Sequence, residues 1–152
     1  MSSIPERWDG ENQWYFVTVA TQPRRPVFAG ADACEILLQA CRELRQYHAY
    51  RLGALVILPD HWHGLICPDY TQGVLIETVV GGIKYNAWKN LAGHDGLTVS
   101  PWQSRFLDHR IRNERDFNQH WQYIWHNPVK HGYVEKSEDW RWVFLHTNPF
   151  GT

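Results

Sequence analysis

Two histidines flank a tryptophan in the stretch LPDHWHGLICP, which runs from Leu58 to Pro68. Successive side chains of a β-strand point to opposite faces, so His61 and His63 share one face while Trp62 points into packing on the other. Two imidazoles on one face can bind a divalent metal ion, and they can equally form a polar patch. The pair alone leaves both interpretations open.

A second set of polar groups lies on a helix that begins near residue 113 or 114 and is predicted to end at His126, because Pro128 disfavours helical backbone at the residue before it. Its apolar stripe consists of Phe117, Trp121, Ile124 and Trp125. A polar ridge on the far side consists of Asp116, His120, Tyr123 and Asn127. Tyr123 and Asn127 are four residues apart, which makes them neighbours on the helix surface.

If the helix packs near the histidines, its polar groups and the two imidazoles can act in one reaction. Two imidazoles and the amide oxygen of Asn127 would make a three-ligand metal site with open positions for phosphate oxygens and water. Tyr123, one turn away, would then be placed to attack phosphorus. A phenol is a poor nucleophile until its proton is removed, so metal polarisation and in-line positioning would supply most of the rate.

Composition restricts the class of protein. The chain has 152 residues, of which 43% are hydrophobic and 20% charged, as expected for a single globular domain spanning residues 1–152 with its core at about 14–145. It has no apolar run of about 20 residues and no basic-then-apolar start, so we expect a cytoplasmic, nucleoid-associated protein that contacts no membrane. The formal net charge of −1 gives no global sign of nucleic-acid binding, so any DNA-binding residues must cluster locally.

The three cysteines predict reduced thiols. Cys34, Cys41 and Cys67 are odd in number and lack C-x-x-C spacing, which argues against a disulfide framework. Cys67 could join His63 as a ligand, but packing at a strand end is the favoured interpretation. The nine tryptophans favour an aromatic core over base stacking.

The elements that must position these groups follow from periodicity. Strands are predicted over 14–21, 51–58, 61–67 and 104–111, with a Pro59-Asp60 turn between the middle two. Helices are predicted over 33–47, with Asp32 and Glu35 as a capping box, and over 72–91, where Gly81-Gly82 would kink or split the helix. This order predicts an α+β fold: a ferredoxin-like (split β-α-β) antiparallel sheet with helices on one face, plus an extra C-terminal helix that carries the tyrosine.

Three stretches resemble one family. LPDHWHGLI resembles the His-hydrophobic-His motif of the HUH endonucleases. WQSRFLDHRIRNERDF and YIWHNPVKHGYVEKSEDWRW resemble the REP-associated tyrosine transposases, and the likeness runs from about Tyr15 to Trp142. The chain departs from the family pattern at two places: Trp62 is bulkier than the usual middle residue of the motif, and Val143-Phe144 stands where serines are common.

The resemblance implies a metal-dependent single-stranded DNA endonuclease and strand transferase that acts beside a hairpin, in DNA transposition and recombination. His61, His63 and Asn127 match the metal ligands, and Tyr123 matches the nucleophile that becomes linked to the 5′ phosphate. The cofactor would be Mg²⁺ or Mn²⁺, and the partner single-stranded or hairpin DNA. Two alternatives stay open: a non-catalytic hairpin-DNA-binding protein, and a metal phosphodiesterase that uses water.

The candidates for contact with the DNA backbone are basic residues in segments that flank the site. Each of them, taken alone, could equally be a solvated surface charge. They are Arg24, Arg25, Lys84, Lys89, Arg105, Arg110 and Arg112. Asp108, His109 and His120 could support the site or face solvent. The chain is expected to act as a monomer or homodimer, and the short loop before the last helix favours a site contained in one chain.

Overall fold

The computed structural model of the chain describes residues 13–22, 25–95 and 99–145. The strands are β1 (Tyr15–Ala20), β2 (Tyr50–Leu58), β3 (His61–Pro68), β4 (Leu107–Arg110) and β5 (Val143–Leu145). The helices are α2 (Ala31–Leu44), α3 (Ile76–Asp95) and α4 (Glu114–Lys130), with short 3₁₀ turns η1 (Tyr70–Gln72) and η2 (Ser137–Asp139). Among these described residues, no helix is both long and apolar enough to span a bilayer.

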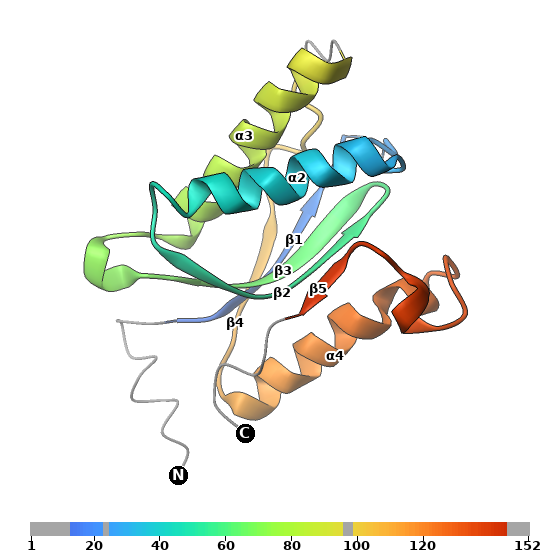
Figure 1. The fold of residues 1–152 in the computed structure, drawn as a ribbon. Coiled ribbons are helices and arrows are strands. Elements are labelled where there is room, and N and C mark those ends of the chain that lie inside the picture. Colours follow the sequence, from blue (N-terminus) through green and yellow to red (C-terminus); the bar gives the residue numbers. More distant parts are fainter. Residues whose placement is uncertain (1–12, 23–24, 96–98, 146–152) are drawn as a thin grey trace.

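The strands form one antiparallel sheet in the order β4-β1-β3-β2-β5, so β3 is the central strand. Helices α2 and α3 cover one face of the sheet, and α4 lies across the other (Figure 1). The α+β prediction, with β1 and β3 inside an antiparallel sheet and the last helix set apart, is therefore confirmed. Strand β5, which no pattern predicted, extends the sheet beside β2.

Each face of the sheet has its own apolar core. The core under α2 and α3 includes Trp62, which is fully buried there as predicted from strand alternation. The predicted helical stripes also lie in this core: Ala33, Leu37, Leu38, Cys41 and Leu44 on α2, and Ile76, Val80, Ile83, Ala87 and Leu91 on α3. Under α4, the rings of Trp14 and Phe117 meet edge to face at 5.1 Å. The central strand is thus buried on both sides.

Several predicted boundaries were wrong, including those of α2, α3 and β4. The capping box is absent, because α2 begins two residues earlier, after Gly30, and no side chain caps it. Asp32 instead lies in the first turn, where its carboxylate interacts favourably with the helix dipole. The fourth strand is shorter than 104–111, since β4 is an edge strand that pairs with β1 only over Leu107–Arg110.

Helix α4 continues through Pro128, although the sequence predicted an end at His126. A proline near the end of a helix removes only its own N–H donor, and the helical bonding resumes when His131 N–H donates to Asn127 O at 3.1 Å. Pro128 is buried, so tertiary packing stabilises this turn. As a result Asn127 lies within the helix, one full turn after Tyr123.

The predicted break at Gly81-Gly82 is also wrong, because α3 is one continuous helix. A Cβ added at Gly82 would come within 2.5 Å of Leu44 Cδ1, whereas a Cβ at Gly81 would meet nothing within 4 Å. Gly82 therefore allows α2 and α3 to approach closely, and Gly81 has no such role.

Gly81→Ala is expected to raise the free energy of unfolding by roughly 0.5–1 kcal/mol, because alanine loses less backbone entropy on helix formation. Gly82→Ala is expected to lower the free energy of unfolding by about 1 kcal/mol relative to the wild-type chain, because the Leu44 side chain must move and this cost exceeds the gain in backbone entropy. Urea unfolding of the two variants measures the difference. Equal effects at both positions would contradict the close packing of α2 on α3.

The three cysteines are buried and form no disulfide bond, as predicted. Burial raises the pKa of Cys34 to about 11, of Cys41 to about 12 and of Cys67 to about 11. Cys67 faces the core under α4 and donates its thiol proton toward Pro68 O at 3.9 Å, which agrees with the packing role.

At pH 8 we expect a thiol-alkylating reagent to label none of the three cysteines in the native protein and all three in urea, because the thiolate is the reacting form. In the folded protein the pKa of each thiol lies above that of an unfolded thiol. The buried, neutral thiols therefore contribute to stability below about pH 8.5, and this contribution is lost as the pH rises toward 11–12. Mass spectrometry counts the labels. Rapid labelling of any native thiol would contradict its burial.

Candidate active site

The two histidines of β3 project together onto the face covered by α4. His61 and His63 are 7% and 5% exposed, and their ring centroids are 4.8 Å apart at 83°. The predicted alternation along β3 is therefore confirmed, with Trp62 between them on the opposite face. Both rings lie in the interior, where polar groups require partners.

Each imidazole is oriented through its Nδ1 atom. The Asp60 carboxylate, in the turn before β3, accepts from His61 Nδ1 at 2.7 Å. Thr18 Oγ1 forms a 2.9 Å hydrogen bond with His63 Nδ1, because Thr18 is the residue opposite His63 on β1. Such partners fix the ring orientation of metal-binding histidines. Coordination by this pair would therefore use Nε2.

Tyr123 lies against this pair within the same chain. Its ring centroid is 5.5 Å from that of His63, and the Phe16 ring packs against both, stacked on His63 at 5.2 Å and edge-on to Tyr123 at 5.8 Å. Tyr123 is 36% exposed, far more than the two histidines. The arrangement puts a partly exposed phenol beside a buried imidazole.

Asn127 is fully buried, and its amide N and O atoms have no hydrogen-bond partner among the described residues. One turn before it, Tyr123 contacts His63, and one turn after it, His131 lies 5.8 Å from His61, centroid to centroid. Because residues four apart share a helix face, Asn127 faces the histidine pair. A buried amide without a partner is costly, and a cation at the imidazoles would satisfy its oxygen.

The sequence placed the polar ridge on the far side of the helix from the apolar stripe, but in the structure parts of both pack toward the sheet. Phe117 and Ile124 pack under β2 beside Trp14, while Asn127 is buried next to them and Tyr123 is only partly exposed. Helix α4 crosses the sheet (Figure 1), so residues of both ridges meet it: Phe117 and Ile124 lie in the apolar core, and Tyr123 lies against His63.

Lys130 adds a cation that the sequence analysis missed. Its Nζ lies 5.0 Å from the centroid of the Tyr123 ring. The spacing of Tyr123, Asn127 and Lys130 at four and seven residues was a visible signal for one helix face. No such signal existed for Phe16 and Thr18, because they reach the site only through the register of β1 against β3.

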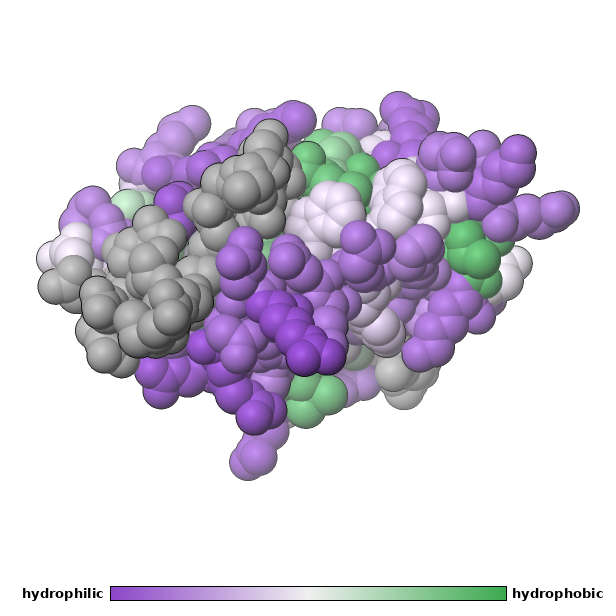
Figure 2. Space-filling model, turned by 90° about the horizontal axis from the view of Figure 1, so that it is seen from below, coloured by the Kyte–Doolittle hydropathy of each residue, from purple (hydrophilic) through white to green (hydrophobic). Residues whose placement is uncertain are grey.

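The predicted DNA-contact residues that the structure describes are not among the side chains that contact the histidine pair or Tyr123. Arg24 falls outside the described residues, and the exposed ones are Arg25, Lys89, Arg105, Arg110 and Arg112. Lys84 is different: its Nζ donates to Gln103 O at 2.9 Å and burial lowers its pKa, so it ties α3 to the segment before β4. Figure 2 shows that the face that carries α4 is mostly hydrophilic.

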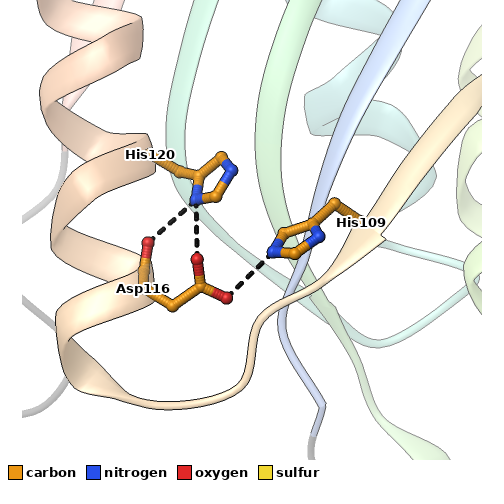
Figure 3. A group of neighbouring side chains, drawn as sticks. All are labelled: His109, Asp116 and His120. Atoms are coloured by element: carbon orange, nitrogen blue, oxygen red, sulfur yellow. Dashed lines mark hydrogen bonds and ion pairs between the residues drawn. The ribbon is translucent and has the colours of Figure 1, made fainter.

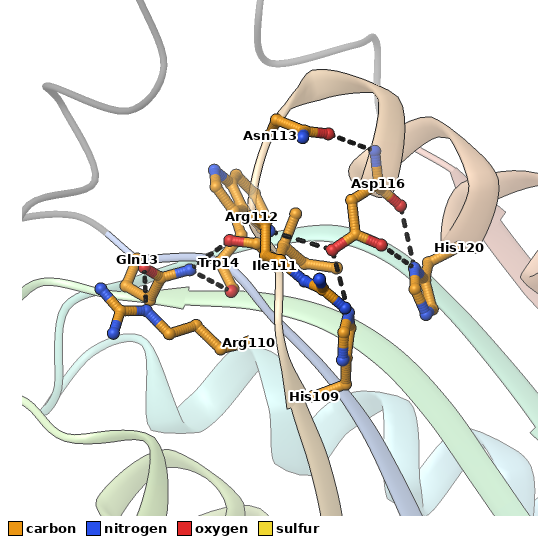
Figure 4. A network of polar contacts seen from close by, with 9 residues as sticks. All are labelled: Gln13, Trp14, His109, Arg110, Ile111, Arg112, Asn113, Asp116 and His120. Atoms are coloured by element: carbon orange, nitrogen blue, oxygen red, sulfur yellow. Dashed lines mark hydrogen bonds and ion pairs between the residues drawn. The ribbon is translucent and has the colours of Figure 1, made fainter.

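A polar network lies next to the site, where β4 passes into α4 (Figure 4). Asp116 accepts from the backbone N–H of Arg112 and from His109 Nε2, both at 2.9 Å. The His120 ring lies 4.7 Å from Phe16, centroid to centroid. The open question about His109 and His120 is thus answered in part: both are held by Asp116.

Several known proteins to which this chain is similar are transposases, or proteins assigned to them. A Haemophilus influenzae protein assigned to the REP-associated tyrosine transposases is 30% identical, over 87% of this chain and 79% of its own length. The Escherichia coli K12 REP-associated tyrosine transposase is also 30% identical, over 88% of this chain and 76% of its own. No family model matches the chain.

Two solved structures are similar as well. The structure of a REP-associated tyrosine transposase bound to a REP hairpin superposes with a TM-score of 0.72 at 28% identity, covering 88% of this chain and 76% of the other. A crystal structure of a Deinococcus radiodurans protein assigned to the transposases has a TM-score of 0.56 at 20% identity, covering 74% of this chain and 88% of the other, a likeness of fold.

Proposed function

Because the chain belongs to the REP-associated tyrosine transposases, we propose that it cuts and rejoins single-stranded DNA through a covalent 5′-phosphotyrosine at Tyr123. The observation that carries this proposal is the position of the Tyr123 ring 5.5 Å from His63, with the buried, unpartnered amide of Asn127 one turn away. A nucleophile beside a metal-binding donor set is what phosphodiester transfer requires.

His61, His63 and Asn127 are the residues that would hold Mg²⁺ or Mn²⁺. The orientation of both imidazoles through Nδ1 and the unmet bonding capacity of the Asn127 oxygen support this donor set. All three ligands are neutral, so they would leave the charge of the cation undiminished. When bound, the ion would polarise a phosphodiester and offset the charge that develops on its oxygens.

Tyr123 would act as the nucleophile. Its Oη forms a bond to phosphorus while the bond from phosphorus to O3′ breaks; the phenol gives up its proton, and the departing 3′ oxygen gains one. One phosphodiester bond replaces another, so attack by a new 3′ hydroxyl can reverse the step without ATP. Phe16 holds the phenol ring, and the Lys130 ammonium beside it would pair with a non-bridging phosphate oxygen.

Hairpin DNA is the proposed substrate, since the structural relative at 28% identity is bound to a REP hairpin. The exposed arginines nearest to α4 in the sequence, Arg105, Arg110 and Arg112, would contact its backbone. The strand order β4-β1-β3-β2, with α2 and α3 on one face, supports the ferredoxin-like split β-α-β topology as the scaffold.

The test is a denaturing gel of the protein incubated with labelled single-stranded hairpin DNA and Mg²⁺. A labelled band that migrates with the protein supports the proposal. Binding without cleavage would instead indicate a non-catalytic hairpin-binding protein. Cleaved fragments without a protein-linked band would indicate a phosphodiesterase that uses water.

We also propose that each chain contains a complete site, because Tyr123 and His63 meet within one chain. A mixture of Tyr123→Phe and His61→Ala proteins is then expected to form no adduct above the sum of the two variants alone. Adduct formed at a quarter or more of the wild-type level would show that a homodimer pairs the tyrosine of one chain with the histidines of another.

A further inference from the structure

Three potential metal ligands converge beside the proposed active site, where β4 meets the start of α4. His109 lies on β4, and Asp116 and His120 lie on the first two turns of α4 (Figure 3). One ligand atom from each lies within 4.8 Å of the others. None of the three is among the residues proposed to hold the catalytic ion.

The distances within this cluster fit the edges of a coordination polyhedron. His109 Nε2 is 2.9 Å from Asp116 Oδ2, and His120 Nδ1 is 3.2 Å from Asp116 Oδ1. Metal–ligand bonds of about 2.0–2.2 Å in a tetrahedron place neighbouring donor atoms roughly 3.3–3.6 Å apart. Since one ligand atom from each residue lies within 4.8 Å of the others, modest side-chain rotations are enough to gather the three around a small cation.

We propose that His109, Asp116 and His120 form a second metal site, for Zn²⁺ or a similar first-row transition ion. Two imidazoles and one carboxylate are a donor set that such ions prefer, whereas Mg²⁺ prefers oxygen ligands. In the metal-free protein, His109 Nε2 donates to the Asp116 carboxylate at 2.9 Å, and His120 Nδ1 donates to the Asp116 backbone carbonyl at 2.8 Å, with the carboxylate 3.2 Å away. The cation replaces the two donated protons, which pass to solvent, and the same nitrogen atoms become ligands.

The cluster is preorganised for a cation. Asn113 Oδ1 accepts from Asp116 N–H at 2.8 Å, and Arg112 N–H donates to the Asp116 carboxylate, so the carboxylate is fixed at the helix start. Burial opposes ionisation of Asp116, but the hydrogen bonds from Arg112 and His109 outweigh it and lower its pKa. The two imidazole rings stack at 4.7 Å and 24°.

Solvent can reach the site. The side chains of His109, Asp116 and His120 are 36%, 16% and 25% exposed, which leaves room for an ion to enter and for water as a fourth ligand. A bound ion would join β4 to α4 three residues before Tyr123 and would hold His120 against Phe16. It would therefore stiffen the helix that carries the nucleophile.

The inference does not rest on the proposed function, because metal binding is measured without DNA. Calorimetric titration of the chelator-stripped full chain with Zn²⁺ is done in a His61→Ala/His63→Ala background, which removes the catalytic donor set. We expect one Zn²⁺ per chain. Adding His109→Ala or Asp116→Asn is expected to weaken binding by more than about 100-fold, beyond the loss of a mere orienting partner.

His126→Ala is the matched control, since His126 is an exposed histidine of α4 outside both clusters. It is expected to leave binding unchanged. If the multiple variants fail to fold, an anomalous-scattering map of wild-type crystals grown with Zn²⁺ decides: a peak between His109 and Asp116 supports the site. No Zn²⁺ binding in the double variant, undiminished binding after His109→Ala, or no peak at the cluster would overturn the proposal.

Discussion

Tyr123→Phe is expected to abolish the covalent protein–DNA adduct and to slow strand cleavage by at least about 10⁴-fold, which is a typical loss of rate when an enzyme loses its nucleophile. The variant lacks the oxygen that would bond to phosphorus, so the proposed covalent step cannot occur. The adduct is measured on a denaturing gel with labelled hairpin DNA and Mg²⁺.

The fold is expected to survive this change. The phenylalanine ring keeps the contacts with His63 and Phe16, and the Tyr123 hydroxyl makes no hydrogen bond to another described residue. The free energy of unfolding should stay within about 0.5 kcal/mol. Tyr85→Phe is the control, because Tyr85 is 58% exposed on α3, and it should form adduct at the wild-type rate. An adduct that persists in Tyr123→Phe would contradict the assignment.

Asn127→Leu is expected to separate stability from activity. A buried amide with no partner costs about 1–3 kcal/mol, so an apolar side chain of similar size should raise the free energy of unfolding of the metal-free protein by roughly 1 kcal/mol. The same change removes the proposed oxygen ligand, and Mg²⁺-dependent cleavage should fall by about 100-fold or more. Urea unfolding in chelator and the adduct rate in Mg²⁺ measure the two effects.

Asn118→Leu makes the same chemical change at an exposed position of α4 and should alter neither quantity strongly. A destabilised Asn127→Leu protein that still cleaves at the wild-type rate would mean that the amide has a structural role only. In that case His61 and His63 would need another third ligand.

Local patterns were sufficient for much of the fold. Strand alternation placed His61 and His63 on one face and Trp62 on the other, and helical spacing identified the buried stripes of α2 and α3. These predictions succeeded because each depends on a repeat within one element. The end of α4 was wrong because packing around Pro128 outweighed its local preference.

The candidate site was harder to predict, because it depends on how separate elements pack. The position of α4 across the sheet makes Asn127 buried, and the register of β1 against β3 brings Thr18 and Phe16 to His63. Neither the crossing direction of a helix nor the register of non-consecutive strands has a periodic signature. For the same reason the sequence did not predict the hydrogen bond between His109 on β4 and Asp116 on α4.

The central claim is that the oxygen of one particular tyrosine becomes bonded to DNA. Peptide mapping by mass spectrometry tests it most directly: the protein–DNA adduct is digested with nuclease and protease, and the peptide that retains a nucleotide is sequenced. We predict a single nucleotide-bearing peptide, modified at Tyr123. A nucleotide found on any other residue, or cleaved DNA with every peptide unmodified, would contradict the account.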